Sequence, residues 1–200
     1  TNALLYFSHA ANSAAIGARG WAAIKPISHD EVMHSDIKVD TLGRVHVLYA
    51  ANSDVYYIHS RDTGVTWSMP VNVSHRPSGV VVEYPRLGID GRGRLHVVWT
   101  DYTAPQGEPI LGAFYAQSID NGQTWSLPLQ ITSGRDYAEI NVVAMGMDEV
   151  HLAWNGRIGF GGRYHQWSAD GGRTWSRIEE IIPRTATGGG RTGPPDMAVD

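Results

Sequence analysis

The 200-residue sequence contains no cysteine. This absence excludes a disulfide framework, thiolate catalysis and any cysteine-based metal site. It does not decide the compartment, since secreted and cytosolic folds can both do without cysteine. Lysine is scarce, and 16 Lys and Arg residues against 20 Asp and Glu residues give a formal charge of −4. Because nucleic-acid-binding proteins normally carry a basic stripe, we predict no nucleic-acid partner.

Long hydrophobic runs are missing as well. No stretch approaches the ~18 apolar residues of a membrane-spanning helix, and the opening residues TNALLYFSHAANS do not form a signal peptide. No window keeps a helical apolar period for three turns. The chain instead has 23 Gly and 10 Pro, with 7 Trp, 9 Tyr and 3 Phe. Turn-forming and aromatic residues in these amounts predict an all-β protein.

One pattern, S-x-D-x-G-x-T-W, occurs three times, at Ser60–Trp67, Ser118–Trp125 and Ser168–Trp175. The Asp can accept hydrogen bonds from turn amides, and the Gly supplies the positive φ of a tight turn. The Trp can bury ~150–250 Å² between neighbouring sheets. We therefore predict structural roles for these residues, each pattern forming one hairpin.

A second pattern, D-x-x-G-R-x-H-V, precedes the first two copies at Asp40–Val47 and Asp90–Val97. A degenerate third copy spans Met145–Leu152. The shared histidines His46, His96 and His151 recur once per repeat, whereas metal ligands must converge on one point. We predict that they make turn or inter-sheet contacts, and we predict no metal and no cofactor.

Each repeat therefore contains four short strands. Radial stacking of such sheets buries both faces, which is the β-propeller architecture. At ~40–50 residues per blade, the chain holds about four blades. We predict three full blades at 36–73, 85–131 and 140–181, the last two strands of another blade at 1–27, and a first strand at 195–200. We interpret the chain as a fragment of a propeller with six to eight blades, the alternative being a closed four-bladed ring.

The S-x-D-x-G-x-T-W pattern is that of the Asp-box, or bacterial neuraminidase repeat, and the chain resembles the sialidase-type Asp-box propeller superfamily. The resemblance implies a β-propeller whose Asp-box hairpins lie opposite the active-site face. Sialidases of this type use three arginines for the substrate carboxylate, a Tyr–Glu nucleophile pair and an Asp acid/base. Their Phe-Arg-Ile-Pro motif is absent here, and Tyr84-Pro85-Arg86-Leu87 is the nearest segment.

Function is expected in the irregular segments between the repeats. These are the loops between blades (28–35, 74–84, 133–139 and 183–194) and the loops inside blades (50–54, 101–109 and 155–162), which include His34, Arg76 and Asp101. Four polar residues hold one register at the start of the innermost strands, each followed by an apolar residue: Asp36, Arg86, Asn141 and Asp196. Strand alternation turns them toward the mouth of the central channel.

The candidate ligand-binding residues are these four together with Glu83, Tyr84, Arg135, Tyr137 and Glu139. Two interpretations stay open: the register holds a polar ligand over the axis, or it only hydrogen-bonds to loops and channel water. We expect a secreted or cell-surface propeller that binds a glycan or a protein partner on its loop face. The alternative is a sialidase-like glycoside hydrolase (an exo-α-sialidase) whose full catalytic set is not contained or not recognisable here, and no catalytic residue is assigned.

Overall fold

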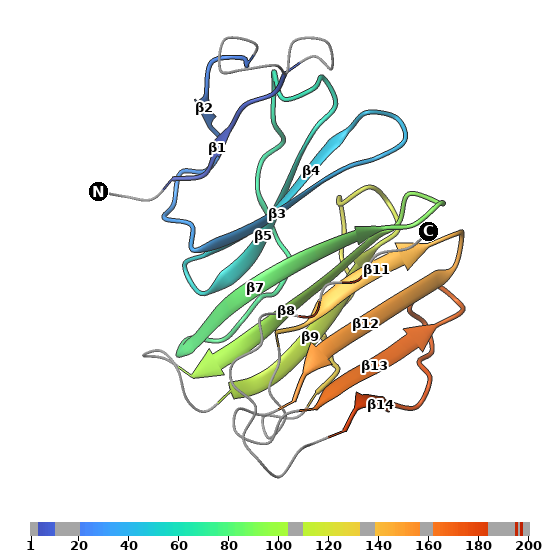
Figure 1. The fold of residues 1–200 in the computed structure, drawn as a ribbon. Coiled ribbons are helices and arrows are strands. Elements are labelled where there is room, and N and C mark those ends of the chain that lie inside the picture. Colours follow the sequence, from blue (N-terminus) through green and yellow to red (C-terminus); the bar gives the residue numbers. More distant parts are fainter. Residues whose placement is uncertain are drawn as a thin grey trace.

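The computed structural model describes residues 4–10, 21–103, 110–132, 139–156, 162–183, 195 and 197. All the regular structure in these residues is β-strand (Figure 1). Three antiparallel sheets have four strands each, joined in chain order, and a fourth sheet has two strands. The predicted all-β class with four-stranded antiparallel blades is confirmed. Among the described residues, no helix is long and apolar enough to cross a membrane.

The three four-stranded sheets are called here the first, second and third blades. The first blade comprises β3 (His34–Val39), β4 (Val45–Ala51), β5 (Asp54–Ser60) and β6 (Val71–Asn72). The second comprises β7 (Val80–Ile89), β8 (Leu95–Thr103), β9 (Ile110–Ser118) and β10 (Leu129–Gln130). The third comprises β11 (Asn141–Met145), β12 (Glu149–Asn155), β13 (Arg163–Ser168) and β14 (Glu179–Ile182). The two-stranded sheet pairs β1 (Tyr6–Phe7) with β2 (Lys25–Pro26).

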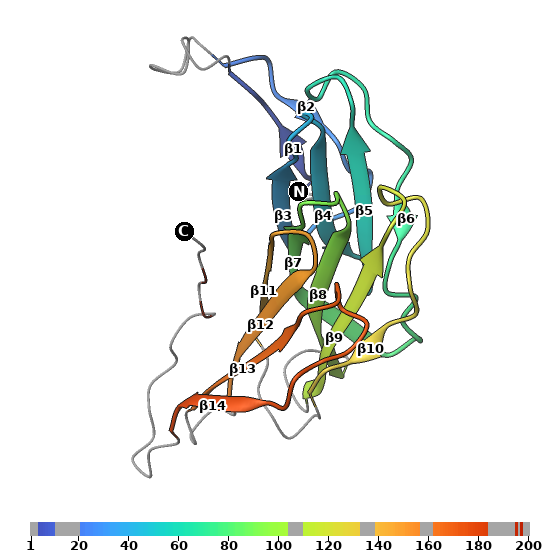
Figure 2. The ribbon, with the colours of Figure 1, turned by 90° about the vertical axis from the view of Figure 1, so that its right-hand side faces the viewer.

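The first strands of the blades, β3, β7 and β11, lie side by side along the inner edge of the fan, while β6 and β10 lie on its outer side (Figure 2). Apolar side chains fill the space between neighbouring blades. Leu48 and Val55 of the first blade pack against Leu87 and Trp99 of the second in one buried cluster. Because both faces of a blade are covered in this way, all seven residues of β4 are buried.

The second blade is longer than its sequence pattern predicted. We expected loops at 74–84 and 101–109, but β7 begins at Val80, and Val80–Glu83 pair with Thr100–Thr103 of β8. The register of this pair shifts between Glu83 and Arg86, so the chain forms a β-bulge there. The bulge interrupts the alternation of the strand, which is why the β-branched run Val80–Val82 was assigned to a loop.

The Asp-box hairpins have the predicted structural role. In the first, Asp62 Oδ1 accepts hydrogen bonds from the Thr66 amide at 2.9 Å and from Ser60 Oγ at 2.7 Å. Asp62 Oδ2 accepts a third from Thr66 Oγ1 at 2.6 Å. These hydrogen bonds lower the pKa of Asp62 to about 2, and the bond from the Thr66 hydroxyl has the largest effect. Gly64 has a φ of 88°, and its counterparts Gly122 and Gly172 have φ values of 84° and 85°.

An aromatic side chain from the two-stranded sheet, from the first blade and from the second blade docks into the Asp-box hairpin of the sheet that follows it. The ring pairs meet edge to face: Phe7 with Trp67 at 5.1 Å, Tyr57 with Trp125 at 5.3 Å, and Tyr115 with Trp175 at 5.0 Å between centroids. The same rings cover Gly64, Gly122 and Gly172 so closely that a methyl group on any of these glycines would overlap them. This aromatic pin, as we call it, repeats at each blade junction in the described chain.

The repeated histidines are structural in the first two blades, as predicted. His46 Nδ1 lies 2.7 Å from Tyr57 Oη, and its Nε2 lies 3.3 Å from Asp40 Oδ2. His96 makes the same contacts with Tyr115 at 2.7 Å and Asp90 at 3.2 Å. Each histidine thus connects the turn after the first strand to the tyrosine of the aromatic pin.

The predicted partial blades fall largely outside the described residues. Of 195–200, the structure describes only Pro195 and Met197, so the strand expected there stays a prediction. Of 1–27, residues 1–3 and 11–20 lie outside the described part, and β1 and β2 lie within the remainder.

Candidate functional site

Six of the nine candidate residues are described: Asp36, Glu83, Tyr84, Arg86, Glu139 and Asn141. Arg135, Tyr137 and Asp196 lie outside the described residues, so their predicted roles stay untested. Asp36 lies within β3, and Glu83, Tyr84 and Arg86 lie within β7. Asn141 is the first residue of β11, and Glu139 stands two residues before it.

Two of the channel-mouth residues are occupied by backbone contacts. Asp36 Oδ1 accepts a hydrogen bond from the Ile37 amide at 2.8 Å, and its Oδ2 accepts one from the Leu87 amide of the next blade at 2.9 Å. Asn141 repeats this arrangement, with Oδ1 accepting from the Val142 amide at 2.8 Å and Nδ2 donating to the Pro195 carbonyl at 3.0 Å. Asp36 therefore ties β3 to β7, and Asn141 ties β11 to Pro195.

Arg86, in the middle of the same register, is different. Its side chain is half-buried, and Nη1 donates to the carbonyl of Pro85 at 3.2 Å. Within the described part of the chain it forms no ion pair with a carboxylate. A guanidinium has five N–H donors, so most of the hydrogen-bonding capacity of Arg86 is left for water or a ligand.

A strained residue precedes Arg86. Tyr84 has a φ of 54°, which is unusual for a residue with a side chain and costs roughly 1–3 kcal/mol. Tyr84 and Pro85 of the β7 bulge lie opposite the single residue Trp99 of β8, and the missing N–H of proline breaks no ladder bond there. The strained backbone directs the Tyr84 ring against the ring of His34, with centroids 4.5 Å apart.

His34 is the site residue that the candidate set missed. It stands two residues before Asp36, as Tyr84 stands two residues before Arg86, so the shared register was the signal that could have paired them. Burial lowers the pKa of His34, and the charge of Arg86 acts in the same direction, whereas that of Glu83 raises it. His34 is therefore a neutral imidazole at neutral pH. His34, Tyr84 and Arg86 together form what we call the bulge site.

Glu139 belongs to a different group. Its Oε2 accepts a hydrogen bond from Asn155 Nδ2 at 2.9 Å, a contact within the third blade. The structure thus divides the described candidates into the bulge site, between the first and second blades, and a third-blade pair formed by Glu139 and Asn155.

A buried ion pair supports the loop end of the same junction. Arg76 Nη2 lies 2.6 Å from Asp101 Oδ2, and Asp101 is completely buried. Trp99 Nε1 donates to Asp101 Oδ1 at 2.8 Å, and the Arg76 guanidinium lies 4.4 Å from the centre of the Phe114 ring. Burial is the main cause that raises the pKa of Asp101 to about 6, against the opposing effect of Arg76. Because the Asp101 carboxylate is fully buried and Arg76 is paired with it, this pair supports the site and does not offer a ligand contact.

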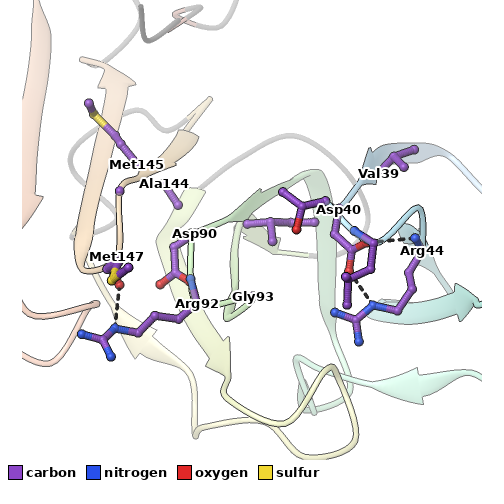
Figure 3. A pocket seen from close by; sticks show the side chains of 14 residues that line it. Val39, Asp40, Arg44, Asp90, Arg92, Gly93, Ala144, Met145 and Met147 are labelled. Atoms are coloured by element: carbon purple, nitrogen blue, oxygen red, sulfur yellow. Dashed lines mark hydrogen bonds and ion pairs between the residues drawn. The ribbon is translucent and has the colours of Figure 1, made fainter.

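A cavity of about 780 Å³ lies at the opposite end of the inner strands (Figure 3). Its lining charges are already paired: Arg44 with Asp40 at 2.5 Å, Arg94 with Asp90 at 2.6 Å and Arg92 with Asp148 at 2.8 Å. Each charged side chain of this lining already has a partner of opposite charge, so the cavity offers no unpaired charge to a ligand. The described residues also contain no group of three or more side chains placed to hold a metal ion.

A family model described as the BNR/Asp-box repeat matches residues 166–177, in the third repeat. Solved structures match the fold at low identity. One is the Hadza microbial sialidase Hz136, with a TM-score of 0.56, 18% identity, and coverage of 75% of this chain and 39% of that one. The chain has the Asp-box propeller fold.

Two more matches support the same fold. The intramolecular trans-sialidase from Ruminococcus gnavus has a TM-score of 0.52 at 16% identity, covering 82% of this chain and 38% of its own. A PL25 polysaccharide lyase, an ulvan lyase bound to -[GlcA(1-4)Rha3S]-, has a TM-score of 0.59 at 14% identity. The match covers 82% of this chain and 47% of the lyase. The Asp-box chain therefore spans less than half the length of each of these three proteins. No curated protein matches its sequence.

Proposed function

We propose that this Asp-box propeller binds an anionic glycan on its loop face, with Arg86 as the anchoring residue. The observation that carries the proposal is the half-buried Arg86 guanidinium, which has no carboxylate partner among the described residues. A planar guanidinium suits the carboxylate or sulfate of an acidic sugar, because it can donate two parallel hydrogen bonds.

The surroundings of Arg86 fit this role. The adjacent stack of Tyr84 and His34 offers aromatic and polar atoms beside the guanidinium, and the neutral state of His34 adds no competing cation. The strain at Tyr84 is what a preorganised binding site would require. Relatives in fold are sialidases and a lyase bound to a glucuronic-acid polymer, which agrees with an acidic sugar as ligand. We further propose a secreted or cell-surface location, where such glycans occur.

The test is calorimetric titration with sialyllactose, with a glucuronic-acid oligosaccharide and with neutral lactose. Arg86→Ala should weaken binding of the acidic sugar by about tenfold to a hundredfold, the usual value of a hydrogen-bonded charge. Arg86→Lys should recover only part of the loss, because lysine cannot donate two parallel bonds. Arg61→Ala, which removes an exposed arginine within the first Asp-box hairpin, is the matched control.

Unchanged affinity in Arg86→Ala, or equal binding of lactose, would contradict the proposal and favour a protein partner. Thermal unfolding of Arg86→Ala is measured in parallel, since a loss of folding would instead give Arg86 the structural role of Asp36 and Asn141.

Glycoside hydrolysis is the second candidate, favoured by the likeness in fold to two sialidases. Glu83 and Tyr84 are the residue types that a sialidase nucleophile pair needs. Turnover of a fluorogenic sialoside by the protein, abolished in Tyr84→Phe, would establish hydrolysis. Absence of turnover across a panel of glycosides, with binding intact, would leave glycan binding as the function.

A further inference from the structure

The third blade departs from the other two at the position of the aromatic pin. Tyr57 and Tyr115 stand three residues before their Asp-box serines, and His165 stands there in the third repeat. The partner is again the repeated histidine: His151 Nδ1 lies 2.9 Å from His165 Nε2. The two imidazoles stack with centroids 5.1 Å apart and planes 18° apart.

The change from tyrosine to histidine alters what protonation does to the pair. A phenol can donate or accept, so a histidine–tyrosine hydrogen bond survives whether the histidine is neutral or charged. A histidine–histidine hydrogen bond needs one donor nitrogen and one acceptor nitrogen, so at least one ring must stay neutral. Double protonation would place two donor nitrogens 2.9 Å apart, on two positively charged rings.

The charged groups around the pair come from all three strands that carry it. Glu149 of β12 has Oε1 at 3.0 Å from His151 Nε2, where the first two blades have Arg44 and Arg94. Glu179 of β14 pairs in register with His165, and Arg163 precedes His165 by two residues on the same face of β13. Burial is the main cause that lowers the pKa of His165, His151 adds to it, and Glu179 opposes both.

We propose that the His151–His165 pair makes the third blade a proton-sensitive element, in which the contact between β12 and β13 holds while one imidazole is neutral and weakens when both are charged. Histidine is the side chain that titrates in the mildly acidic range. Since His165 takes up a proton less readily in the fold than in the unfolded chain, the folded state binds fewer protons. Stability therefore falls as the pH drops through the ordinary histidine value of about 6.5.

The chain supplies its own test variant. His165→Tyr restores the pair found in the first two blades, and His165→Gln keeps a hydrogen-bonding side chain without charge. The free energy of unfolding is measured by urea titration at about pH 7.5 and about pH 5.5, on either side of the ordinary histidine pKa. The control is His29→Tyr, which removes an exposed histidine far from the third blade in sequence.

From about pH 7.5 to about pH 5.5, the folding equilibrium constant of the wild type should fall several-fold more than that of either His165 variant. Each unit by which the pKa of His165 differs between the folded and unfolded states changes this constant by at most about tenfold. His29→Tyr should follow the wild type. If both His165 variants keep the pH dependence of the wild type, the proposal is wrong. It is equally contradicted if nuclear magnetic resonance finds His165 titrating at or above its ordinary value.

Discussion

The junction between the first and second blades and the junction between the second and third carry their charges at opposite ends. The first is joined at the loop end by the partly buried Arg76 and the fully buried Asp101. The second is joined at the turn end, where Arg92 and Arg94 both bind Asp148 at 2.8 and 2.9 Å. Asp148 takes the place that Gly43 and Gly93 occupy in the other two repeats, so the first junction cannot form this second contact.

What the two junctions share is the apolar core and the aromatic pin. Tyr57 and Tyr115 meet Trp125 and Trp175 with nearly the same geometry, although the ion pairs at the two junctions lie at opposite ends. The comparison indicates that the apolar core and the pin are the common elements of the two junctions. The ion pairs differ from one junction to the other, and their contribution to the free energy of unfolding depends on whether water reaches them.

Loss of Arg76 should be the most damaging change. Arg76→Ala leaves the Asp101 carboxylate buried without its partner, which costs about 3–5 kcal/mol in comparable cases. Urea unfolding at neutral pH measures the effect. Because the folded pKa of Asp101, about 6, lies above its unfolded value, the folded state binds more protons than the unfolded chain between about pH 4 and about pH 6. Acidification through that window should therefore restore part of the stability of the variant.

The double variant with Asp101→Asn provides the control, since it removes the buried charge together with its partner. It should be more stable than Arg76→Ala alone at neutral pH. A loss below about 1 kcal/mol in Arg76→Ala, the range of exposed ion pairs, would mean that the Asp101 carboxylate is not buried as described.

The glycine under each aromatic pin should matter equally at both junctions. Gly122→Ala and Gly172→Ala each place a methyl group against a tyrosine ring and strain a backbone with φ near 85°. We expect each variant to lose about 1–3 kcal/mol, the range of overpacked and strained sites. Thermal unfolding measures the loss, and Gly79→Ala separates the two causes, since Gly79 has a φ of 86° but open space around it.

Unequal losses at Gly122 and Gly172 would show that the pin is not the common element of the two junctions. A loss in Gly79→Ala as large as in the other two would assign the effect to backbone strain alone.

Removal of Asp148 should have the smallest effect, although its carboxylate binds two arginines. Its side chain is partly open to water, where competing hydration and salt offset the attraction. Hydrogen bonds from Arg92 and Arg94 lower the pKa of Asp148, and the bond from Arg92 has the largest effect. Asp148→Asn should lower the midpoint of thermal unfolding slightly in dilute buffer and not at all in molar salt. A loss as large as that of Arg76→Ala would contradict the distinction drawn between the two junctions.

Much of the fold could be predicted from the repeated residues, because these residues form contacts with one another within each repeat. An Asp followed by a Gly and a Trp at fixed spacing forms the same hairpin in each blade, and the histidines of the first two repeats contact the aspartates of their turns. The β7 bulge could not be predicted, since it depends on the pairing of Val80–Glu83 with a strand about twenty residues away. The same is true of the division of the candidate residues between the bulge site and the third blade.

The amino-acid sequence alone determined the class of fold, the number of strands per repeat and the roles of the Asp-box residues, because those depend on contacts within a few positions along the chain. Only the tertiary structure decided that Asp36 and Asn141 bond to backbone groups of Leu87 and Pro195 while Arg86 stays available, and that His34 meets Tyr84. Those outcomes depend on which atoms of the next blade come within hydrogen-bonding distance. Such distances are set by the packing of whole sheets against one another and not by local sequence.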